Sequence, residues 1–166
     1  MIDGSEAMRP VGPPFLPANF VRIRRFQPGD LAGVLELVNA TFREQYDHRM
    51  YLALAATWPD ATLVAVDGSQ RLVGIIFASL QREVEGRILI FAIQPELRNR
   101  GLGSRMLREF LLVCLSRGMR AVTLEVRVSN ESAIRFYTRH GYRLVGHLPS
   151  FYRDGEAGYV MRKAIP

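Results

Sequence analysis

The spacing of hydrophobic residues along the chain predicts an alternation of strands and helices. Seven segments alternate apolar and polar residues or are continuously apolar, as strands are, and four others repeat apolar residues at helical spacing. The predicted strands cover residues 20–26, 61–67, 71–81, 87–93, 121–126, 142–148 and 158–164. The predicted helices cover residues 27–42, 48–58, 104–118 and 129–141.

Turn and capping residues separate these segments. The Asp-Gly-Ser sequence at 67–69 is a hairpin signal between two strands, and Glu85-Gly86 leads into the next strand of the same meander. Asp30 is placed to cap the first helix, while Gly118 and Gly141 are placed to end the last two helices. Strand and helix boundaries are therefore defined along most of the chain.

The order of elements is β-α-α-β-β-β-α-β-α-β-β, without an internal repeat. This order predicts an α/β (α+β) fold with a mixed, mostly antiparallel central sheet of about seven strands and helices on both faces. We expect a single domain over residues 21–166. The segment 1–20 is rich in Pro and Gly, which predicts a flexible N-terminal arm.

The charge balance adds a hint about the ligand. The chain has 22 Lys and Arg against 16 Asp and Glu, a net charge of +6, and Lys163 is its only lysine. Arginine is suited to bidentate contacts with phosphate and carboxylate, so an anionic ligand is one interpretation. A solvated basic surface is the alternative.

Other classes of protein are disfavoured by what the sequence lacks. Cys114 is the only cysteine, so no internal disulfide forms, and its place in an apolar helix predicts a core residue. No secretory signal pattern and no apolar stretch of membrane-spanning length occur, so we expect a cytoplasmic protein without a membrane partner. No His, Asp and Glu cluster indicates a metal site.

The stretch LRNRGLGSRML, residues 97–107, joins a predicted strand to a predicted helix. Free N–H groups in a helix's first turn, together with the helix dipole, form an anion site. Gly101 and Gly103 allow close approach of a ligand to the backbone. Arg98, Arg100 and Arg105 add positive charge nearby. The stretch therefore predicts a phosphate-binding turn, although many strand–Gly–helix turns bind nothing.

Other phosphate-binding patterns fit this stretch less well. A dinucleotide loop needs a third glycine at Met106 and a preceding βαβ unit, and a P-loop needs Gly-Lys-Ser/Thr. Nucleic-acid binding needs exposed aromatic residues or a recognition helix, whereas this helix is mostly apolar. We therefore expect no nucleic-acid partner.

The segment Arg98 to Gly103 resembles the acetyl-CoA motif Q/R-x-x-G-x-G/A of the GNAT superfamily of N-acetyltransferases, and it stands in that superfamily's order of elements. The resemblance implies that the turn holds the pyrophosphate of acetyl-CoA and that the preceding strand pairs with the pantetheine arm. The implied cofactor contacts are Phe91, Ala92, Ile93, Arg98, Asn99, Arg100, Gly101, Leu102, Gly103, Ser104, Asn130 and Tyr137.

The segment Leu124 to Tyr142 resembles a signature of protein N-terminal acetyltransferases of the RimI and NatA types. The resemblance implies that Asn130 contacts CoA, that Tyr137 protonates the departing thiolate and that Glu125 is the general base. The residues themselves also allow simpler roles. Asn130 is a natural helix cap, Tyr137 fits a core position, and Glu125 in an apolar strand needs either an ion-pair partner or a function.

Two further segments resemble the substrate-binding parts of NatA-type enzymes. Within residues 42–67, Glu44 and Tyr46 are implied to line a peptide groove, and within residues 150–163, Tyr152 is implied to close its other side. Arg43 replaces a usual proline, which leaves the peptide preference open. The alternative is that these segments are a helix terminus and a surface hairpin.

The leading hypothesis is a protein N-terminal acetyltransferase, with acetyl-CoA as co-substrate, no metal, and either Glu125 or Glu44 as the base. The alternatives are acetylation of lysine side chains or a small amine, and a non-catalytic basic binding module. The expected partners are protein or peptide N-termini, with a ribosome or an auxiliary subunit as further candidates. We expect a monomer or a weak dimer.

Overall fold

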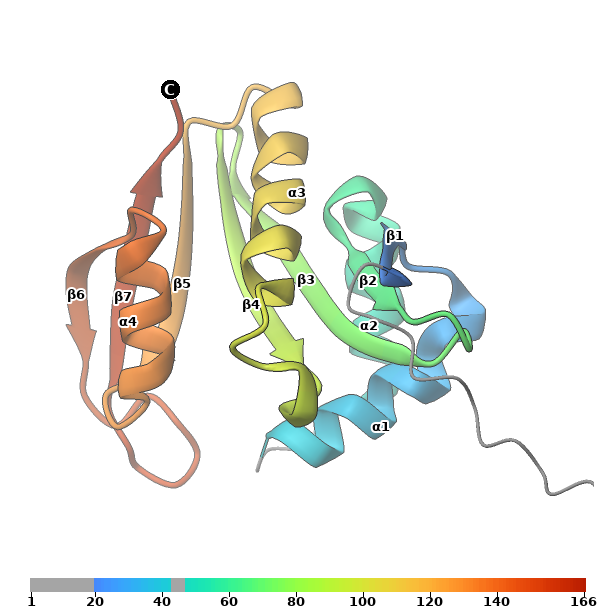
Figure 1. The fold of residues 1–166 in the computed structure, drawn as a ribbon. Coiled ribbons are helices and arrows are strands. Elements are labelled where there is room, and N and C mark those ends of the chain that lie inside the picture. Colours follow the sequence, from blue (N-terminus) through green and yellow to red (C-terminus); the bar gives the residue numbers. More distant parts are fainter. Residues whose placement is uncertain (1–19, 43–46) are drawn as a thin grey trace, which may run out of the picture.

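The computed structural model describes residues 20–42 and 47–166 as one seven-stranded sheet with helices on both faces (Figure 1). The predicted fold class and all seven predicted strands are confirmed. The strand order across the sheet is β1-β2-β3-β4-β5-β7-β6. The strands are β1 (Arg22–Arg25), β2 (Leu63–Val66), β3 (Leu72–Arg82), β4 (Glu85–Ile93), β5 (Ala121–Arg127), β6 (Arg143–Leu148) and β7 (Gly158–Ala164).

The sheet consists of two antiparallel parts joined by one parallel pair. Strands β1 to β4 form an antiparallel meander, as the hairpin signals predict. Strands β4 and β5 run parallel, because α3 connects them as a crossover. Strand β7 pairs antiparallel with both β5 and β6, so the last strand of the chain lies inside the sheet and β6 lies at its edge.

The four predicted helices are also confirmed. They are α1 (Leu31–Thr41), α2 (His48–Thr57), α3 (Leu102–Ser116) and α4 (Glu131–Arg139), with short 3-10 turns at Pro28–Asp30, Pro59–Ala61 and Pro95–Leu97. Helices α1 and α2 pack on one face of the sheet, and α3 and α4 cover the other (Figure 1). Each face has its own hydrophobic core, one centred on Val34 and Phe77 and the other on Met106 and Phe110. Within the described ranges no helix is long and apolar enough to cross a bilayer.

Helix ends follow the predicted capping residues, with one correction. Gly118 and Gly141 have φ angles of 70° and 83°, the left-handed conformation that ends α3 and α4. Asp30 stands at the N-cap position of α1, but its side chain makes no cap bond to that helix. Its carboxylate accepts hydrogen bonds from the Arg24 guanidinium and the Gln27 N–H instead, because a 3-10 turn precedes α1.

Gly74 of β3 lies directly under side chains that pack between α3 and the sheet. A Cβ atom there would lie 2.6 Å from the Met106 sulfur and 3.0 Å from Ile93 Cδ1. Both neighbours are packed in the core under α3, so the space at Gly74 is determined by the packing of α3 on β3.

We expect Gly74→Ala to lower the free energy of unfolding by about 1–3 kcal/mol, because the added methyl overpacks this contact. Urea unfolding measures the loss. Gly29→Ala is the matched control, since a Cβ atom at Gly29 meets nothing within 4 Å. Equal stabilities of the two variants would contradict a close contact at Gly74.

Candidate functional site

The sheet divides into a fork between β4 and β5. The two strands pair only over Glu85–Ile88 and Ala121–Leu124, and beyond these residues no described pair joins them. They diverge downward in Figure 1, toward the N-terminal end of α3. Because the facing edges of residues 89–93 and 125–127 are not paired with each other, their backbone groups can pair with an extended ligand.

A β-bulge lies where the fork begins. Phe77 faces Ile90 and the next residue, Ala78, faces Ile88, so the register between β3 and β4 skips Leu89. A bulge turns the following side chains to the opposite face and interrupts the ladder locally. After the bulge, Phe91 and Ile93 pack toward α3 and α4, while Ile90 and Ala92 face the other core. The predicted ligand contacts Phe91, Ala92 and Ile93 therefore all lie along the open arm of the fork.

The predicted phosphate-binding turn lies at the N-terminus of α3. Gly101 has a φ of 85° and is the N-cap residue, and Asn99 also has a positive φ of 58°. The first N–H groups of a helix have no partner within it, so Leu102, Gly103 and Ser104 present amides at this end. Arg98 donates from Nε to the Ile93 carbonyl oxygen at 3.0 Å, which ties the turn to the end of β4.

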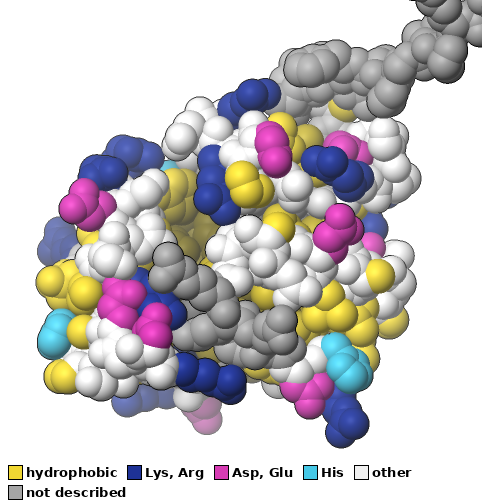
Figure 2. Space-filling view, turned by 90° about the horizontal axis from the view of Figure 1, so that it is seen from below, with side chains coloured by type: hydrophobic (Ala, Val, Ile, Leu, Met, Phe, Trp, Pro, Cys, Tyr) yellow, Lys and Arg dark blue, Asp and Glu magenta, His cyan; other side chains and the backbone are white. Residues whose placement is uncertain are grey.

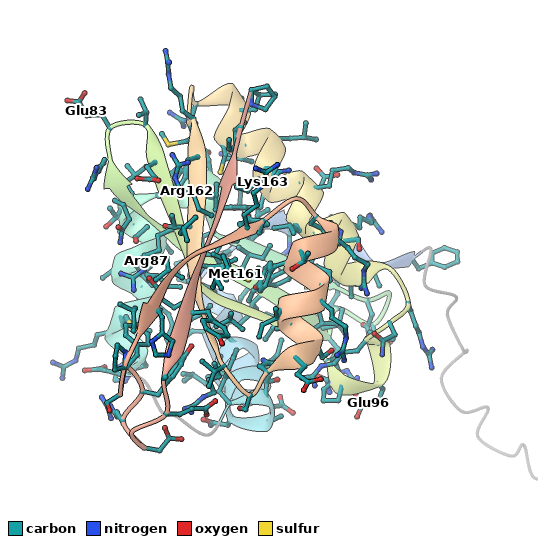
Figure 3. All side chains as sticks on the ribbon, turned by 90° about the vertical axis from the view of Figure 1, so that its left-hand side faces the viewer. Glu83, Arg87, Glu96, Met161, Arg162 and Lys163 are labelled. Atoms are coloured by element: carbon teal, nitrogen blue, oxygen red, sulfur yellow. The ribbon has the colours of Figure 1, made fainter. Side chains whose placement is uncertain are left out.

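A basic hollow of about 520 Å³ extends from this turn along α3. It is lined by Gly101, Ser104, Arg105, Arg108, Leu111, His140 and Lys163. Lys163 comes from β7 and lies on the side of the sheet that carries α3 and α4 (Figure 3). Positive side chains beside a helix N-terminus suit a ligand with several phosphate groups. The anionic ligand expected from the sequence therefore has a candidate binding surface in this hollow.

Aromatic residues form one wall of the fork. Phe91 of β4 packs against Phe136 of α4, with ring centroids 5.9 Å apart, and its ring lies 6.5 Å from that of Tyr137. A Cβ atom at Gly103 would lie 3.4 Å from the Phe136 ring, so glycine permits α3 to approach α4 there. Seen from below, the surface is hollowed on the side of β5 to β7, and hydrophobic side chains lie deep in the hollow (Figure 2).

Tyr137 is buried at this wall and is only 8% exposed. Burial raises the pKa of its phenol well above the ordinary value, and the neighbouring Tyr152 raises this pKa further. The phenol is therefore neutral at physiological pH. It can donate a hydrogen bond or a proton to a negative charge that develops in the fork.

Glu125 is the first residue of β5 beyond its pairing with β4. Its carboxylate accepts hydrogen bonds from Arg87 at 2.8 Å, and the two side chains are 15% and 27% exposed. Arg87 comes from β4 and points to the side of the sheet opposite Lys163 (Figure 3). The carboxylate thus has an ion-pair partner, one of the two roles expected from the sequence. Its role as a base stays a prediction.

The other predicted site residues have mixed outcomes. Asn130 caps α4, because its side-chain oxygen accepts from the Ala133 N–H at 3.1 Å. Its predicted contact with CoA is not tested by this bond. Tyr152 follows β6 and lies beside Arg127, whose guanidinium carbon is 4.0 Å from the ring centroid. Glu44 and Tyr46 lie outside the described residues.

Several residues at this site were not predicted from the sequence. Arg87 pairs with Glu125, Arg127 contacts Tyr152, and His140 lines the basic hollow. Arg87 and Glu125 are 38 positions apart, so no local pattern indicates their contact.

Among the described residues no group of three or more His, Cys, Asp or Glu is arranged to hold a metal ion. Burial raises the pKa of the Cys114 thiol to about 12, so this cysteine is not a nucleophile at neutral pH.

Comparison with known proteins identifies relatives over most of the chain. The sequence profile described as Acetyltransferase (GNAT) family matches residues 31–142. An uncharacterized N-acetyltransferase of Methanocaldococcus jannaschii, MJ1530, is 36% identical over 87% of this chain and 92% of its own length. The N-terminal acetyltransferase A complex catalytic subunit NAA10 of Arabidopsis thaliana is 31% identical over 87% of this chain and 78% of its own.

A solved structure shows the same fold. Ard1 from Thermoplasma volcanium superposes with a TM-score of 0.85 at 33% sequence identity. The superposition covers 89% of this chain and 99% of that structure. The overall fold of this chain is therefore shared with a protein of known structure.

Proposed function

This chain belongs to the acetyltransferase (GNAT) family, and we propose that it transfers the acetyl group of acetyl-CoA to the α-amino group of a protein or peptide N-terminus. The relative from Arabidopsis, at 31% identity, carries the name of an N-terminal acetyltransferase catalytic subunit. Family membership supports an acyltransferase, and this relative supports the α-amine as the acceptor.

The observation that carries the proposal is the fork between β4 and β5. Its open arm ends at the N-terminus of α3 and the basic hollow, which suits the phosphate groups of acetyl-CoA. Glu125 of β5 lies where the fork opens, and Tyr137 of α4 lies at its aromatic wall. Acetyl-CoA along one arm leaves the acceptor amine to enter from the side of Glu125 and Tyr152.

The chemistry needs a neutral amine and a stabilised leaving group. The amine nitrogen bonds to the thioester carbonyl carbon, the carbon–sulfur bond breaks, and the amine proton passes to a base. At pH 7 the neutral fraction is about a tenth for an α-amine with a pKa near 8. It is below about a thousandth for a lysine side chain. Glu125 or Glu44 accepts the proton, and Tyr137 donates to the sulfur.

The assembly and location of the protein belong to the same proposal. The Arabidopsis relative is named as the catalytic subunit of a complex, which supports an auxiliary subunit as a partner. We propose a cytoplasmic enzyme, monomeric or weakly dimeric by itself, that meets new N-termini alone, at a ribosome or with such a subunit.

Incubation of the full chain with acetyl-CoA and either a set of N-terminal peptides or a polyamine, followed by mass spectrometry, tests the proposal. Each peptide carries an internal lysine, so that fragmentation locates the added acetyl group. Acetylation of the α-amine supports the proposal. Acetylation of the lysine side chain, or of a polyamine alone, indicates the small-amine or lysine alternative, and no transfer to any acceptor contradicts the catalytic hypothesis.

Gly101→Ala tests the predicted phosphate turn. Gly101 has a positive φ and open space around it, so an alanine costs about 1 kcal/mol of stability through the backbone alone. We expect this variant also to weaken acetyl-CoA binding by about tenfold or more, because the methyl group projects where the pyrophosphate approaches the amides. Calorimetric titration with acetyl-CoA measures the effect.

Gly118→Ala is the matched control for this substitution. Gly118 also has a positive φ, with nothing within 4 Å of an added Cβ atom, but it lies at the opposite end of α3. We expect the same loss of stability and an unchanged affinity for acetyl-CoA. Equal affinities of the two variants for acetyl-CoA would show that the turn is not part of the acetyl-CoA site.

A further inference from the structure

The segment between β6 and β7, residues 149–157 (the β6–β7 segment), is tied to the end of β5 by Arg127. One guanidinium nitrogen, Nη1, lies 2.8 Å from Asp154 Oδ2 and 2.7 Å from Glu156 Oε2. The Arg127 side chain is 22% exposed, which is low for a surface arginine. One cation thus binds two carboxylates that are 27 and 29 positions away in the sequence.

Glu156 connects the same segment to the loop before α4. Its Oε1 accepts a hydrogen bond from the Ser129 hydroxyl at 2.6 Å and another from the Ser129 N–H at 3.0 Å. The Ser129 bonds and the Arg127 guanidinium hold the pKa of Glu156 below its ordinary value, and Arg127 does the same for Asp154. Both carboxylates are therefore ionised at neutral pH, so their ion pairs with Arg127 and the hydrogen bonds from Ser129 are present at that pH.

Tyr152 is held between Arg127 and the backbone of β7. The Arg127 guanidinium carbon lies 4.0 Å from the centroid of the Tyr152 ring, a cation–π contact. Arg127 faces Gly158 in the register of β5 and β7, and a Cβ atom at Gly158 would lie 3.4 Å from Tyr152 Cε2. The Tyr152 N–H also donates to the Glu156 carbonyl oxygen at 3.0 Å. The ring position is thus determined by contacts on both sides.

This position is next to the fork, because Arg127 ends the arm of β5 that is not paired with β4. Tyr152 also raises the pKa of Tyr137 in α4. Isolated surface ion pairs contribute little, but Arg127 combines two carboxylates and an aromatic ring in one network. A network of this kind restricts a segment whose backbone is otherwise outside the sheet.

We propose that Arg127 is a positioning residue for the acceptor peptide: by binding Asp154, Glu156 and the face of Tyr152, it holds the β6–β7 segment as one fixed wall of the peptide site. The proposal rests on the proposed function, because the acceptor enters from this side only if acetyl-CoA occupies the other arm of the fork. Arg127 does not touch the reacting atoms. Its effect on turnover passes through Tyr152.

The test compares Arg127→Gln with the wild-type protein in peptide acetylation and in hydrogen exchange. We expect the KM for the acceptor peptide to rise about tenfold, while the KM for acetyl-CoA stays within about twofold. Amide exchange within the β6–β7 segment is expected to accelerate, with exchange in α3 unchanged. Arg127→Lys, which keeps the charge and loses the planar fork, is expected to restore part of the peptide KM.

Arg162→Gln is the matched control. It breaks an ion pair of the same kind, in which Arg162 Nε lies 2.8 Å from Glu85 Oε1, away from the β6–β7 segment. We expect neither KM to change in this variant. Glu156→Gln, which removes one carboxylate of the same network, is expected to raise the peptide KM as well and provides a second test if Arg127→Gln does not fold.

A double variant decides whether Arg127 acts through Tyr152. If it does, Arg127→Gln costs little in the peptide KM when Tyr152 is already alanine. Additive costs of the two substitutions, or equal changes in both KM values, would overturn the positioning role. If the wild-type protein acetylates no peptide, the proposed function fails instead, while faster exchange of the β6–β7 segment in Arg127→Gln still reports on the network.

Discussion

Tyr137→Phe is expected to lower kcat by about 10²- to 10⁴-fold while the Kd for acetyl-CoA stays within about twofold. The range is typical of removing a positioned general acid. The substitution removes one hydroxyl and keeps the ring that packs against Phe136 and Tyr142. Burial raises the pKa of the phenol, so the hydroxyl carries its proton at any working pH and is available to the departing sulfur. Steady-state kinetics and titration with acetyl-CoA measure the two quantities.

Tyr142→Phe is the control for this experiment. Tyr142 is 1% exposed, lies beside Tyr137, and its hydroxyl has no hydrogen-bond partner in the described part of the chain. Removing that hydroxyl is expected to leave kcat unchanged and to preserve or increase stability, because an unpaired buried polar group is lost. Unchanged turnover of Tyr137→Phe would assign Tyr137 to the core alone.

Glu125→Gln is expected to lower kcat/KM by about 10²-fold at pH 7, with a loss that shrinks as the pH rises. The rate loss shrinks with rising pH because the acceptor amine itself loses its proton. As the pH passes the α-amine pKa near 8, a growing fraction of the amine is already neutral, so less is lost with the base. A pH–rate profile from pH 6 to 9.5 measures this. A loss that is equal at all pH values would instead assign Glu125 to binding.

Substitution of Arg87 distinguishes the two possible roles of Glu125, ion-pair partner and general base. If the carboxylate serves only as the partner of Arg87, then Arg87→Gln and Glu125→Gln give equal rate losses, and the double variant loses no more than either. If Glu125 is the base, only variants that lack its carboxylate show the pH-dependent loss. Glu44→Gln, measured in the same profile, identifies Glu44 as the base if its loss is the one that shrinks with pH.

The fold was predicted closely because its signals are local. Strand alternation, helical spacing and the glycines that end α3 and α4 are short-range patterns, and all seven strands and four helices lie where these patterns place them. Asp30 is the exception. Its carboxylate accepts hydrogen bonds from Arg24 of β1 and from the Gln27 N–H of a 3-10 turn instead of capping α1.

The sequence by itself also determined the class of chemistry, because the turn at Arg98–Gly103 and the segment with Glu125 and Tyr137 have the spacing of a known family. Only the tertiary structure decided how these parts meet. The parting of β4 from β5 after Ile88 forms the fork in which we propose that acetyl-CoA and the acceptor bind. Contacts such as Arg87 with Glu125 and Arg127 with Tyr152 join residues 25 or more positions apart, so their geometry arises from strand pairing across the sheet and not from any local pattern.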